Sequence, residues 1–464
     1  MLAFRESSTG VRHFFHSDPP SRAFRAFFPN TETGVKSSRS PARIIFTLAL
    51  VYGLFQIVFP TGFGFGSGWE TVAIARELAR TGVYGNPFHA GASGATAVIA
   101  PLFPLYLAGL IKLLGDTPAF ALAASLAAVL ALALHAALLP RLSLMLFGDS
   151  RAGILAGLLS VPAFRLMPQW DAAFTACGIL LFLLKASPAT WRSIALSGGA
   201  AGLLLLANPA TILITGPWVI YLCQQRRLSL FRSAAFGAAV FLTALPWMIR
   251  NESMLGTFSV KDNLGMTIYA SNNNCASSSL QASIASACYD AAHPNLSVHE
   301  LRVLNEIGEV PYDHARTSDA VLWIRTHPGV FARLTTERIL NFWFPRSAIP
   351  RYPDLVIQVV TCLSVPGLLL LVCRGIPVSW YMIAVAVIHP LLYYVVVSDV
   401  RYRYSLLWLS LLCAGYFLNA VLKWLLPVTD TRMTGDSPPA LEQSDTELPH
   451  FAFIVSNPSR TRAV

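Results

Sequence analysis

The sequence is poor in charge. Only 12% of its 464 residues are Asp, Glu, Lys or Arg, which is about half the fraction found in soluble domains. Hydrophobic residues make up 54% of the chain and recur in long runs. This composition excludes an ordinary soluble domain and indicates a polytopic membrane protein. The net charge of +10 comes from scattered cations beside apolar segments, which is typical of positive-inside topology and predicts no nucleic-acid partner.

Cysteine is also scarce. The chain has seven cysteines with no CxxC pair and no paired histidines beside them, so the sequence predicts no metal site, although a divalent cation cofactor remains an option. Cys275 and Cys288 flank a polar segment in the one long hydrophilic loop. If that loop faces an oxidising compartment, they can close a disulfide. The other cysteines lie in or next to apolar segments and are expected to be small buried hydrophobes: Cys177, Cys223, Cys362, Cys373 and Cys413.

The start of the chain does not have the pattern of a cleaved signal peptide, because no short basic region leads directly into an apolar core and a small-residue cleavage site. We therefore expect targeting by the first membrane span. Composition divides the chain into five expected parts. These are a disordered basic cytoplasmic tail (1–43), a transmembrane core with a first outer loop at 61–117 (44–249), an extracytoplasmic α-rich subdomain (250–352), C-terminal transmembrane helices (353–427) and a disordered cytoplasmic tail (428–464).

Apolar runs predict an all-α bundle of about ten transmembrane helices with both termini in the cytoplasm. The short loops that this topology places inside are rich in cations, as the positive-inside rule requires. The expected spans lie near 44–60, 119–139, 151–165, 172–184, before 208, before 226, 234–248, 355–373, 377–397 and 404–426.

The first outer loop predicts two helices on the membrane surface. The segment TVAIARELAR places Val72 and Ala75 on one side and Arg76 and Arg80 on the other, which suits an interfacial helix. The segment 101–114 is apolar but too short for a span of roughly 20 residues. In the long hydrophilic loop, 297–309 and 328–343 have helical spacing, and NNNCASSS is expected to be a loop.

The predicted topology gathers several charges at the outer face. Charged side chains next to apolar membrane spans are energetically costly unless they form ion pairs or take part in function, so they are candidates for functional residues. Arginines at span ends can also snorkel to lipid headgroups. A convergent set of cations with one or two acids suits a lipid-linked phosphate held by arginines and a carboxylate acting as base. The set is Glu70, Arg165, Asp171, Arg250, Arg401 and Arg403.

Both acids also have a structural interpretation. Ser67-Gly68-Trp69-Glu70 fits a capping box, in which Ser67 caps a helix and Glu70 bonds back to a backbone N–H. Asp171 fits the N-cap of the fourth span. From the residues alone, both a helix-capping role and a catalytic role stay open for Glu70 and for Asp171.

Five motifs in order resemble the GT-C superfamily of integral-membrane glycosyltransferases. The chain is most similar to the bacterial glycosyltransferase family 39 group, which is related to protein O-mannosyltransferases and lipid A aminoarabinose transferases. The motifs are GWETVAIARELARTGVYGNPF, TAVIAPLFPLYLAGLIKLLG, ALPWMIRNESMLGTFSVKDNLGMTIYASNN, LWIRTHPGVFARLTTERILNFWFP and VRYRYSLLWLSLLCAGYFL.

The resemblance implies an active site at the outer membrane face, a polyprenyl-phosphate-linked sugar donor and inversion at the anomeric carbon. Glu70 matches the acid of the first outer loop, which serves as general base, and Asp171 matches a second acid. Arg250, Arg401 and Arg403 would hold the donor phosphate, and we add Arg165 and Tyr269 to the expected substrate contacts. The acceptor could be a lipid, a glycan or a protein.

The sequence thus predicts a multi-pass glycosyltransferase of a bacterial inner membrane with its site facing the periplasm. One alternative is a non-enzymatic transporter or flippase, but transporters favour mid-membrane ionisable groups and internal repeats, and neither is clear here. A ligase or polymerase of lipid-linked glycans is a second alternative, which differs chiefly in its donor.

Overall fold

The computed structural model describes residues 31–60, 69–186, 190–346 and 352–426, with side chains from residue 40 onward. The chain divides into two compact units, residues 1–422 and 423–464. Within the described residues the fold is all-helical, apart from two isolated bridges. This agrees with the predicted fold class. Residues 1–30 and 427–464, which cover most of the two predicted tails, lie outside the described residues.

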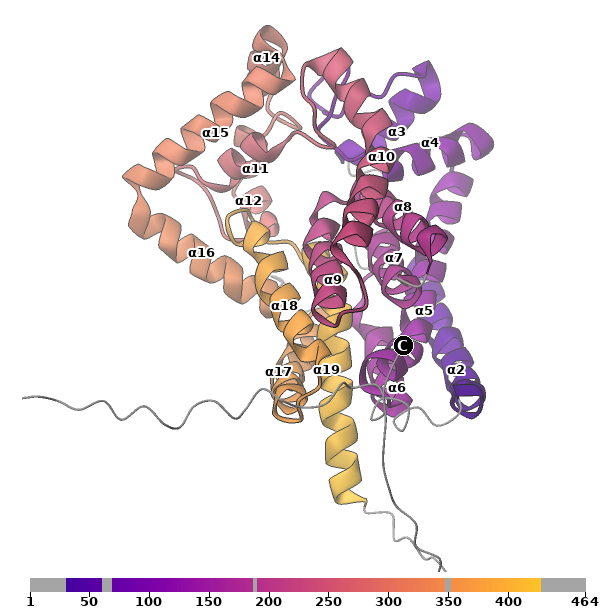
Figure 1. Ribbon diagram of the computed structural model, residues 1–464. Coiled ribbons are helices and arrows are strands. Elements are labelled where there is room, and N and C mark those ends of the chain that lie inside the picture. The colour runs from indigo at the N-terminus through magenta and orange to yellow at the C-terminus, as the bar shows by residue number, and fades with distance from the viewer. Residues whose placement is uncertain (1–30, 61–68, 187–189, 347–351, 427–464) are drawn as a thin grey trace, which may run out of the picture. The chain divides into compact units, whose positions relative to one another are not determined.

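The N-terminal half contains the first outer loop and a group of mutually packed helices (Figure 1). Helix α2 packs along α5, α5 packs along α6, and α8 packs along α10. The helices are α2 (Thr31–Val58), α3 (Glu70–Thr81), α4 (Leu102–Leu114), α5 (Pro118–Phe147), α6 (Ser150–Ala163), α7 (Ala172–Lys185), α8 (Trp191–Ala207), the 3-10 turn η2 (Pro209–Thr211), α9 (Ile212–Gln224) and α10 (Leu230–Leu255).

Helix α2 begins at Thr31, whereas the sequence predicted disorder up to residue 43. Extending an existing helix adds one hydrogen bond for each residue fixed, so an apolar span can carry helix into a polar flank. Helix α3 follows the prediction. Its Val72 and Ala75 are buried, and Arg80 is exposed.

The long hydrophilic loop folds into helices, which lie at the upper left in Figure 1. The predicted helices at 297–309 and 328–343 are present, and four more were not predicted because they are short or carry no clear apolar stripe. The six are α11 (Leu264–Ser271), α12 (Leu280–Ala285), α13 (Cys288–Ala292), α14 (Val298–Ile307), α15 (Glu309–Thr326) and α16 (Pro328–Trp343).

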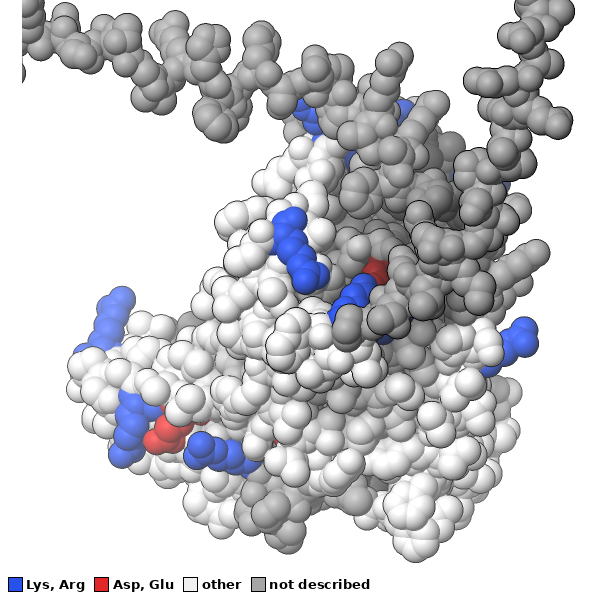
Figure 2. Space-filling view, turned by 90° about the horizontal axis from the view of Figure 1, so that it is seen from below, with Lys and Arg blue, Asp and Glu red and all other residues white. Residues whose placement is uncertain are grey.

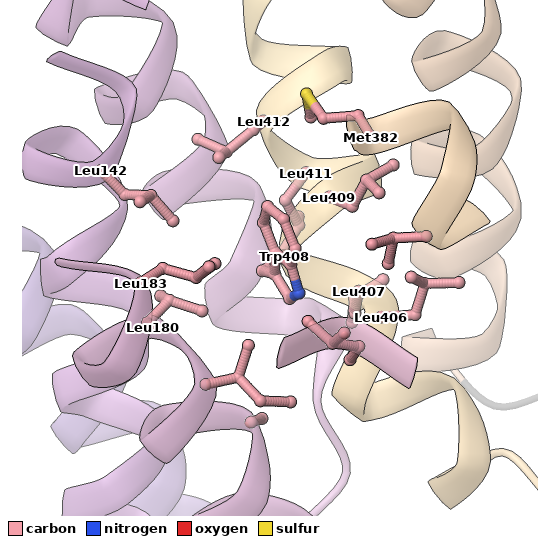
Figure 3. Packing of buried hydrophobic residues seen from close by; sticks show 14 of the residues in the cluster. Leu142, Leu180, Leu183, Met382, Leu406, Leu407, Trp408, Leu409, Leu411 and Leu412 are labelled. Carbon is pink, nitrogen blue, oxygen red and sulfur yellow. The ribbon is translucent and has the colours of Figure 1, made fainter. Parts of the chain in front are cut away.

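The chain then enters α17 (Tyr352–Cys373), α18 (Val378–Tyr394) and α19 (Arg401–Leu425). Helix α19 is the centre of the packed core. In its most apolar stretch 72% of the residues are buried, against 17–39% in the other long apolar helices. Trp408 is fully buried and lies among leucines of α5, α7 and α19 and Met382 of α18 (Figure 3).

Among the described residues, five helices are long and apolar enough to cross a membrane, namely α2, α5, α10, α17 and α19. Five shorter apolar helices accompany them: α4, α6, α7, α8 and α18. A helix of 14 residues such as α6 is only about 21 Å long, less than a hydrocarbon core of roughly 30 Å. The apolar helices indicate a multi-pass membrane protein, and the count of ten spans stays a prediction.

One end of the first unit is distinctly cationic. Figure 2 views the molecule from below, at the end where α2 begins in Figure 1. The described charged side chains on this face are mostly Lys and Arg, with few acids.

The first outer loop is held by two charged side chains from distant helices. The Arg250 guanidinium donates to the carbonyls of Tyr84 (2.9 Å) and Thr96 (2.7 Å). The Glu309 carboxylate accepts hydrogen bonds from the Thr96 hydroxyl and the Ala97 N–H, both at 2.6 Å. These bonds tie a segment without regular structure to α10 and α15.

Close contact between α17 and α19 predicts a sharp steric penalty at Gly367. A Cβ at this position would overlap the backbone carbonyl of Cys413. We expect Gly367→Ala to destabilise the protein by about 1–3 kcal/mol or more, measured as a lower unfolding temperature in detergent. The control is Gly237→Ala, where a Cβ would meet no atom within 4 Å. Equal unfolding temperatures for the two variants would contradict this packing.

The Glu309 contact predicts a pH-dependent stability. Burial raises the pKa of Glu309 to about 7, although the bonds from Thr96 and Ala97 and the charge of Arg250 oppose that rise. The folded protein therefore binds this proton more tightly than the unfolded chain. Its stability should fall as the pH rises from about 4.5 through about 7, by an amount on the order of 3 kcal/mol.

Thermal unfolding at pH 5 and pH 8 measures this dependence. Glu309→Gln should remove most of it, because an amide carries no proton that titrates in this range. Glu306→Gln is the matched control, since Glu306 is exposed on α14. The idea fails if the Glu309 and Glu306 variants show the same pH dependence.

Candidate active site

A cavity of about 320 Å³ lies where the first outer loop, α7, the segment before α11, α13 and the start of α19 meet. It brings two acids and two cations into one space: Glu70, Asp171, Lys261 and Arg401. The polar and aromatic residues around them include Trp170, Asn208, Asn263, Tyr289, His293, Tyr393 and Tyr402.

Glu70 is the first residue of α3, and Trp69 is the N-cap. The capping-box prediction is therefore wrong, because Glu70 would have to be the third helical residue. Ser67, its predicted partner, lies outside the described residues. Glu70 is 5% exposed, and its Oε1 lies 3.9 Å from Nδ1 of His293. The carboxylate is thus directed into the protein and lines the cavity.

Asp171 occupies the N-cap position of α7 but does not cap its backbone. Its carboxylate accepts hydrogen bonds from the Thr175 hydroxyl (2.9 Å) and the Asn208 side-chain amide (3.0 Å). These two bonds fix the carboxylate at the cavity wall. Asp171 is thus at the predicted N-cap position, but its side chain does not form the predicted capping hydrogen bond.

Lys261 was not predicted as a site residue, although the third motif contains it. Burial lowers the pKa of Lys261, and the charges of Asp171 and Glu70 oppose that effect. No described carboxylate lies close enough to form an ion pair with its ammonium group. Its only sequence signal is its isolation as the one lysine between Lys185 and Lys423.

Arg401 lies at the start of α19, where it lines the cavity as predicted for a site residue. Its guanidinium carbon is 3.5 Å from the centre of the Trp170 ring, and its Nε is 3.9 Å from Asp399 Oδ1. Its Nε and Nη1 atoms have no hydrogen-bond partner. Arg401 thus brings a positive charge to the cavity wall.

Arg165 borders a much smaller cavity, of about 20 Å³, that shares Trp69, Trp170 and Arg401 with the large one. Its side chain is buried, and its Nε and Nη1 atoms have no hydrogen-bond partner. Arg165 is therefore next to the site without lining its main space.

The structure does not bring Arg250, Arg403 or Tyr269 into the large cavity. Arg250 binds the carbonyls of the first outer loop, and Arg403 is fully buried, with its guanidinium donating to Ser410 and lying over the Trp343 ring. Tyr269 packs beneath the guanidinium of Arg316. Arg250 thus finds its partners in the first outer loop, whereas Nε and Nη1 of Arg403 have no hydrogen-bond partner among the described residues although they lie outside the large cavity.

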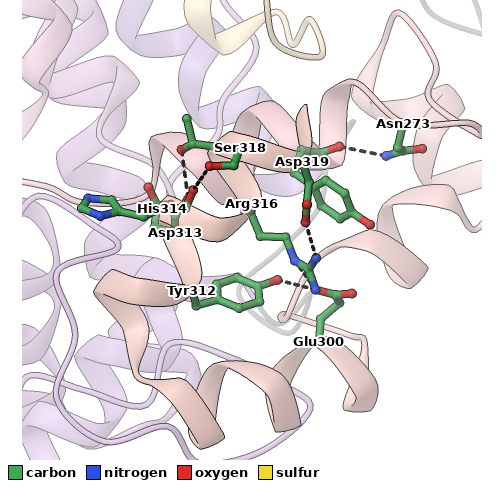
Figure 4. A network of polar contacts seen from close by, with 10 residues as sticks. Asn273, Glu300, Tyr312, Asp313, His314, Arg316, Ser318 and Asp319 are labelled. Atoms are coloured by element: carbon green, nitrogen blue, oxygen red, sulfur yellow. Dashed lines mark hydrogen bonds and ion pairs between the residues drawn. The ribbon is translucent and has the colours of Figure 1, made fainter. Parts of the chain in front are cut away.

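Figure 4 shows the polar network around Arg316, the residue that lies over Tyr269. Arg316 pairs with Glu300 and Asp319, each at 2.7 Å, and Tyr312 donates to Glu300 at 2.6 Å. Ion pairs that satisfy one another in this way position helices α14 and α15. The network explains why Tyr269 has a packing role in this structure.

The predicted pairing of Cys275 with Cys288 is present as a disulfide. Cys177 and Cys413 are buried, as expected for small hydrophobes, and Cys223 is half-buried. Cys362 and Cys373 are exposed on α17, contrary to that expectation. An apolar helix that faces lipid needs no protein cover, so a cysteine on such a face stays exposed in the isolated chain.

No protein-family model and no curated protein sequence matches the chain. Its fold is similar to that of an oligosaccharyltransferase from Archaeoglobus fulgidus, solved in complex with Zn and sulfate. That comparison covers 82% of this chain and 49% of the other, with a TM-score of 0.50 and 14% identity. This chain therefore spans about half the length of the oligosaccharyltransferase.

Two further solved structures are similar at lower TM-scores. The archaeal oligosaccharyltransferase AglB from Archaeoglobus fulgidus, in complex with an inhibitory peptide and a dolichol-phosphate, has a TM-score of 0.49 at 13% identity and covers 83% of this chain and 50% of its own. ArnT from Cupriavidus metallidurans, bound to undecaprenyl phosphate, has a TM-score of 0.35 at 14% identity and covers 84% and 78%. The predicted GT-C resemblance is confirmed at the level of the fold by the first structure.

Proposed function

We propose that the protein is an inverting membrane glycosyltransferase. It moves a sugar from a polyprenyl-phosphate-linked donor to a lipid, glycan or protein acceptor at the extracytoplasmic face. The observation that carries the proposal is the cavity, which places Glu70 and Asp171 together with Lys261 and Arg401. The motif resemblance and the fold similarity to the archaeal oligosaccharyltransferase support it.

The proposed reaction is a single displacement at the anomeric carbon. The acceptor nucleophile forms a new bond to that carbon as the bond to the phosphate oxygen breaks, and the lipid phosphate leaves with the electron pair. Glu70 takes the proton of the acceptor, which requires approach to within about 3 Å. Attack from the side opposite the phosphate inverts the configuration.

Lys261 and Arg401 are the proposed contacts of the donor phosphate. Negative charge grows on the phosphate as the glycosidic bond breaks, so fixed cations stabilise the transition state more than the ground state. Both cations line the same cavity as Glu70. Arg165 borders the adjoining space and is the next candidate.

Asp171 is the proposed second acid of the site. Its bonds to Thr175 and Asn208 hold it in a fixed orientation, so it can accept a hydrogen bond from a sugar or acceptor hydroxyl without first losing side-chain freedom. The described part of the chain has no group of three or more His, Cys, Asp or Glu side chains placed to hold a metal ion.

The proposed topology has about ten spans, with the cavity facing outward in a bacterial inner membrane. The cationic face in Figure 2 would be cytoplasmic under the positive-inside rule. The shorter apolar helices would need a locally thin bilayer or support from their neighbours to complete their crossings.

Replacing Glu70 tests the base assignment. Glu70→Gln keeps the size of the side chain and removes its ability to take a proton, so kcat should fall by roughly 100-fold or more. The measurement is sugar transfer by purified protein from a panel of polyprenyl-phosphate sugars. Glu77→Gln is the control, because Glu77 lies on the same helix and pairs with Arg80 outside the cavity. Full activity of a folded Glu70→Gln protein would reject the assignment.

Replacing Lys261 tests the phosphate contact. Lys261→Met removes the charge with little change in volume, so kcat/KM for the donor should fall by roughly 100-fold. Lys112→Met, at an exposed position on α4, is the control and should behave as wild type. An unchanged kcat/KM in the Lys261 variant would show that its ammonium group does not bind the donor.

A further inference from the structure

The Cys275–Cys288 disulfide closes a ring, residues 275–288, that forms part of the cavity wall. The two cysteines are 13 residues apart, and α12 lies between them. Leu280 of the ring lines the cavity, as do Tyr289 and His293 in the residues directly after it. The ring is therefore built into the candidate site.

On one side the ring and the residues after it contact the segment that carries Glu70. Leu280 and Tyr289 belong to the same apolar cluster as Trp69, the residue directly before Glu70. His293 stacks on the Tyr289 ring at 4.7 Å between centroids, and its Nδ1 lies 3.9 Å from Glu70 Oε1. Glu70 is thus enclosed by side chains that the ring positions.

Of these two aromatic residues, Tyr289 is the one whose side chain can donate a hydrogen bond to Glu70. Burial and the charge of Glu70 raise the pKa of Tyr289 well above its usual value, so its hydroxyl keeps the proton that it can donate. Burial lowers the pKa of His293, and its Nδ1 accepts a hydrogen bond from the backbone N–H of Asn295 at 3.1 Å. A neutral imidazole that accepts at Nδ1 does not donate to Glu70 from that atom.

On its other side the ring bonds to the chain that leads into α19. The Leu280 N–H donates to the Ser398 carbonyl, and the Ser398 N–H donates to the Ser278 carbonyl, each at 3.0 Å. Ser398 is three residues before Arg401. The backbone of the ring therefore holds the start of the helix that presents Arg401 to the cavity.

We propose that the 275–288 ring is a positioning element that fixes Glu70 and Arg401 relative to each other, with Tyr289 as the positioning residue for Glu70. Activity then depends on the closed disulfide, because opening it frees the ring to move away from both. The inference rests on the proposed role of Glu70 as base. It adds a redox dependence to that role.

The first test needs no substrate. A water-soluble carbodiimide with an amine nucleophile labels accessible carboxyl groups, and mass spectrometry measures the extent at Glu70. We expect at least threefold more label at a fixed pH in reduced wild type, in C275S/C288S and in Tyr289→Phe, because Glu70 is 5% exposed when enclosed. C362S/C373S, which removes two exposed cysteines of α17, should match wild type. Equal labelling of Glu70 in all samples overturns the proposal.

The second test uses kcat and the donor KM of sugar transfer to distinguish the contact of the ring with Glu70 from its contact with the start of α19. Tyr289→Phe should lower kcat roughly tenfold with little change in the donor KM, because it disturbs Glu70 alone. C275S/C288S should lower kcat and also raise the donor KM, because Arg401 is released as well. Reoxidation of reduced wild type should restore both values. Full activity of the reduced enzyme, or a Tyr289→Phe effect on KM alone, overturns the proposal.

The two proposals can fail separately. If Glu70→Gln keeps full activity, the base assignment fails, while carbodiimide labelling still decides whether the ring positions Glu70. Tyr289→Phe leaves the disulfide intact, so it tests the positioning role even if C275S/C288S does not fold. Circular dichroism and the unfolding temperature of each variant identify folded samples.

Discussion

The fold of the candidate site depends on how the buried backbone of the first outer loop finds hydrogen-bond partners. Residues 82–101 form no helix, yet Tyr84, Phe88 and Ala97 are buried. A buried backbone group without a partner costs about 1–3 kcal/mol. Arg250 and Glu309 meet this requirement from two different helices. Fixed from both sides, the loop orients α3, and α3 begins with Glu70.

The same physical requirement separates the cations of this protein into two kinds. Arg250 and Arg338 direct their guanidinium groups at carbonyl oxygens; Arg338 binds those of Ser271 and Val395 from a fully buried position. Lys261 and Arg401 instead line the large cavity, where no backbone carbonyl of the described residues is recorded as their partner. A buried cation without fixed partners is costly. We therefore assign the proposed donor contacts to Lys261 and Arg401. Arg250 and Arg338 stabilise the fold around the site.

The cavity is assembled from segments far apart in the chain. Glu70 comes from the first outer loop, Lys261 from the segment before α11, and Arg401 from the start of the last helix. Helix α19 connects the site to the main hydrophobic core, where Trp408 is fully buried. The 275–288 ring bonds to Ser398 just before this helix. Opposite charges that line a cavity inside a protein attract each other more strongly than the same charges in bulk water.

The sequence alone determined the all-helical class, most helix positions, the disulfide pair and three of the four charged residues of the cavity. Apolar runs and the charges at their ends are local properties of the chain, so they can be recognised in the sequence without knowledge of the fold. It did not separate Arg250 from Arg401, because both are arginines at predicted span ends. It also missed Lys261, Tyr289 and His293, which lie in a polar loop with no periodic pattern. Only the tertiary structure decided these roles, because the difference between a cation that binds backbone and one that faces a cavity lies in its distant neighbours.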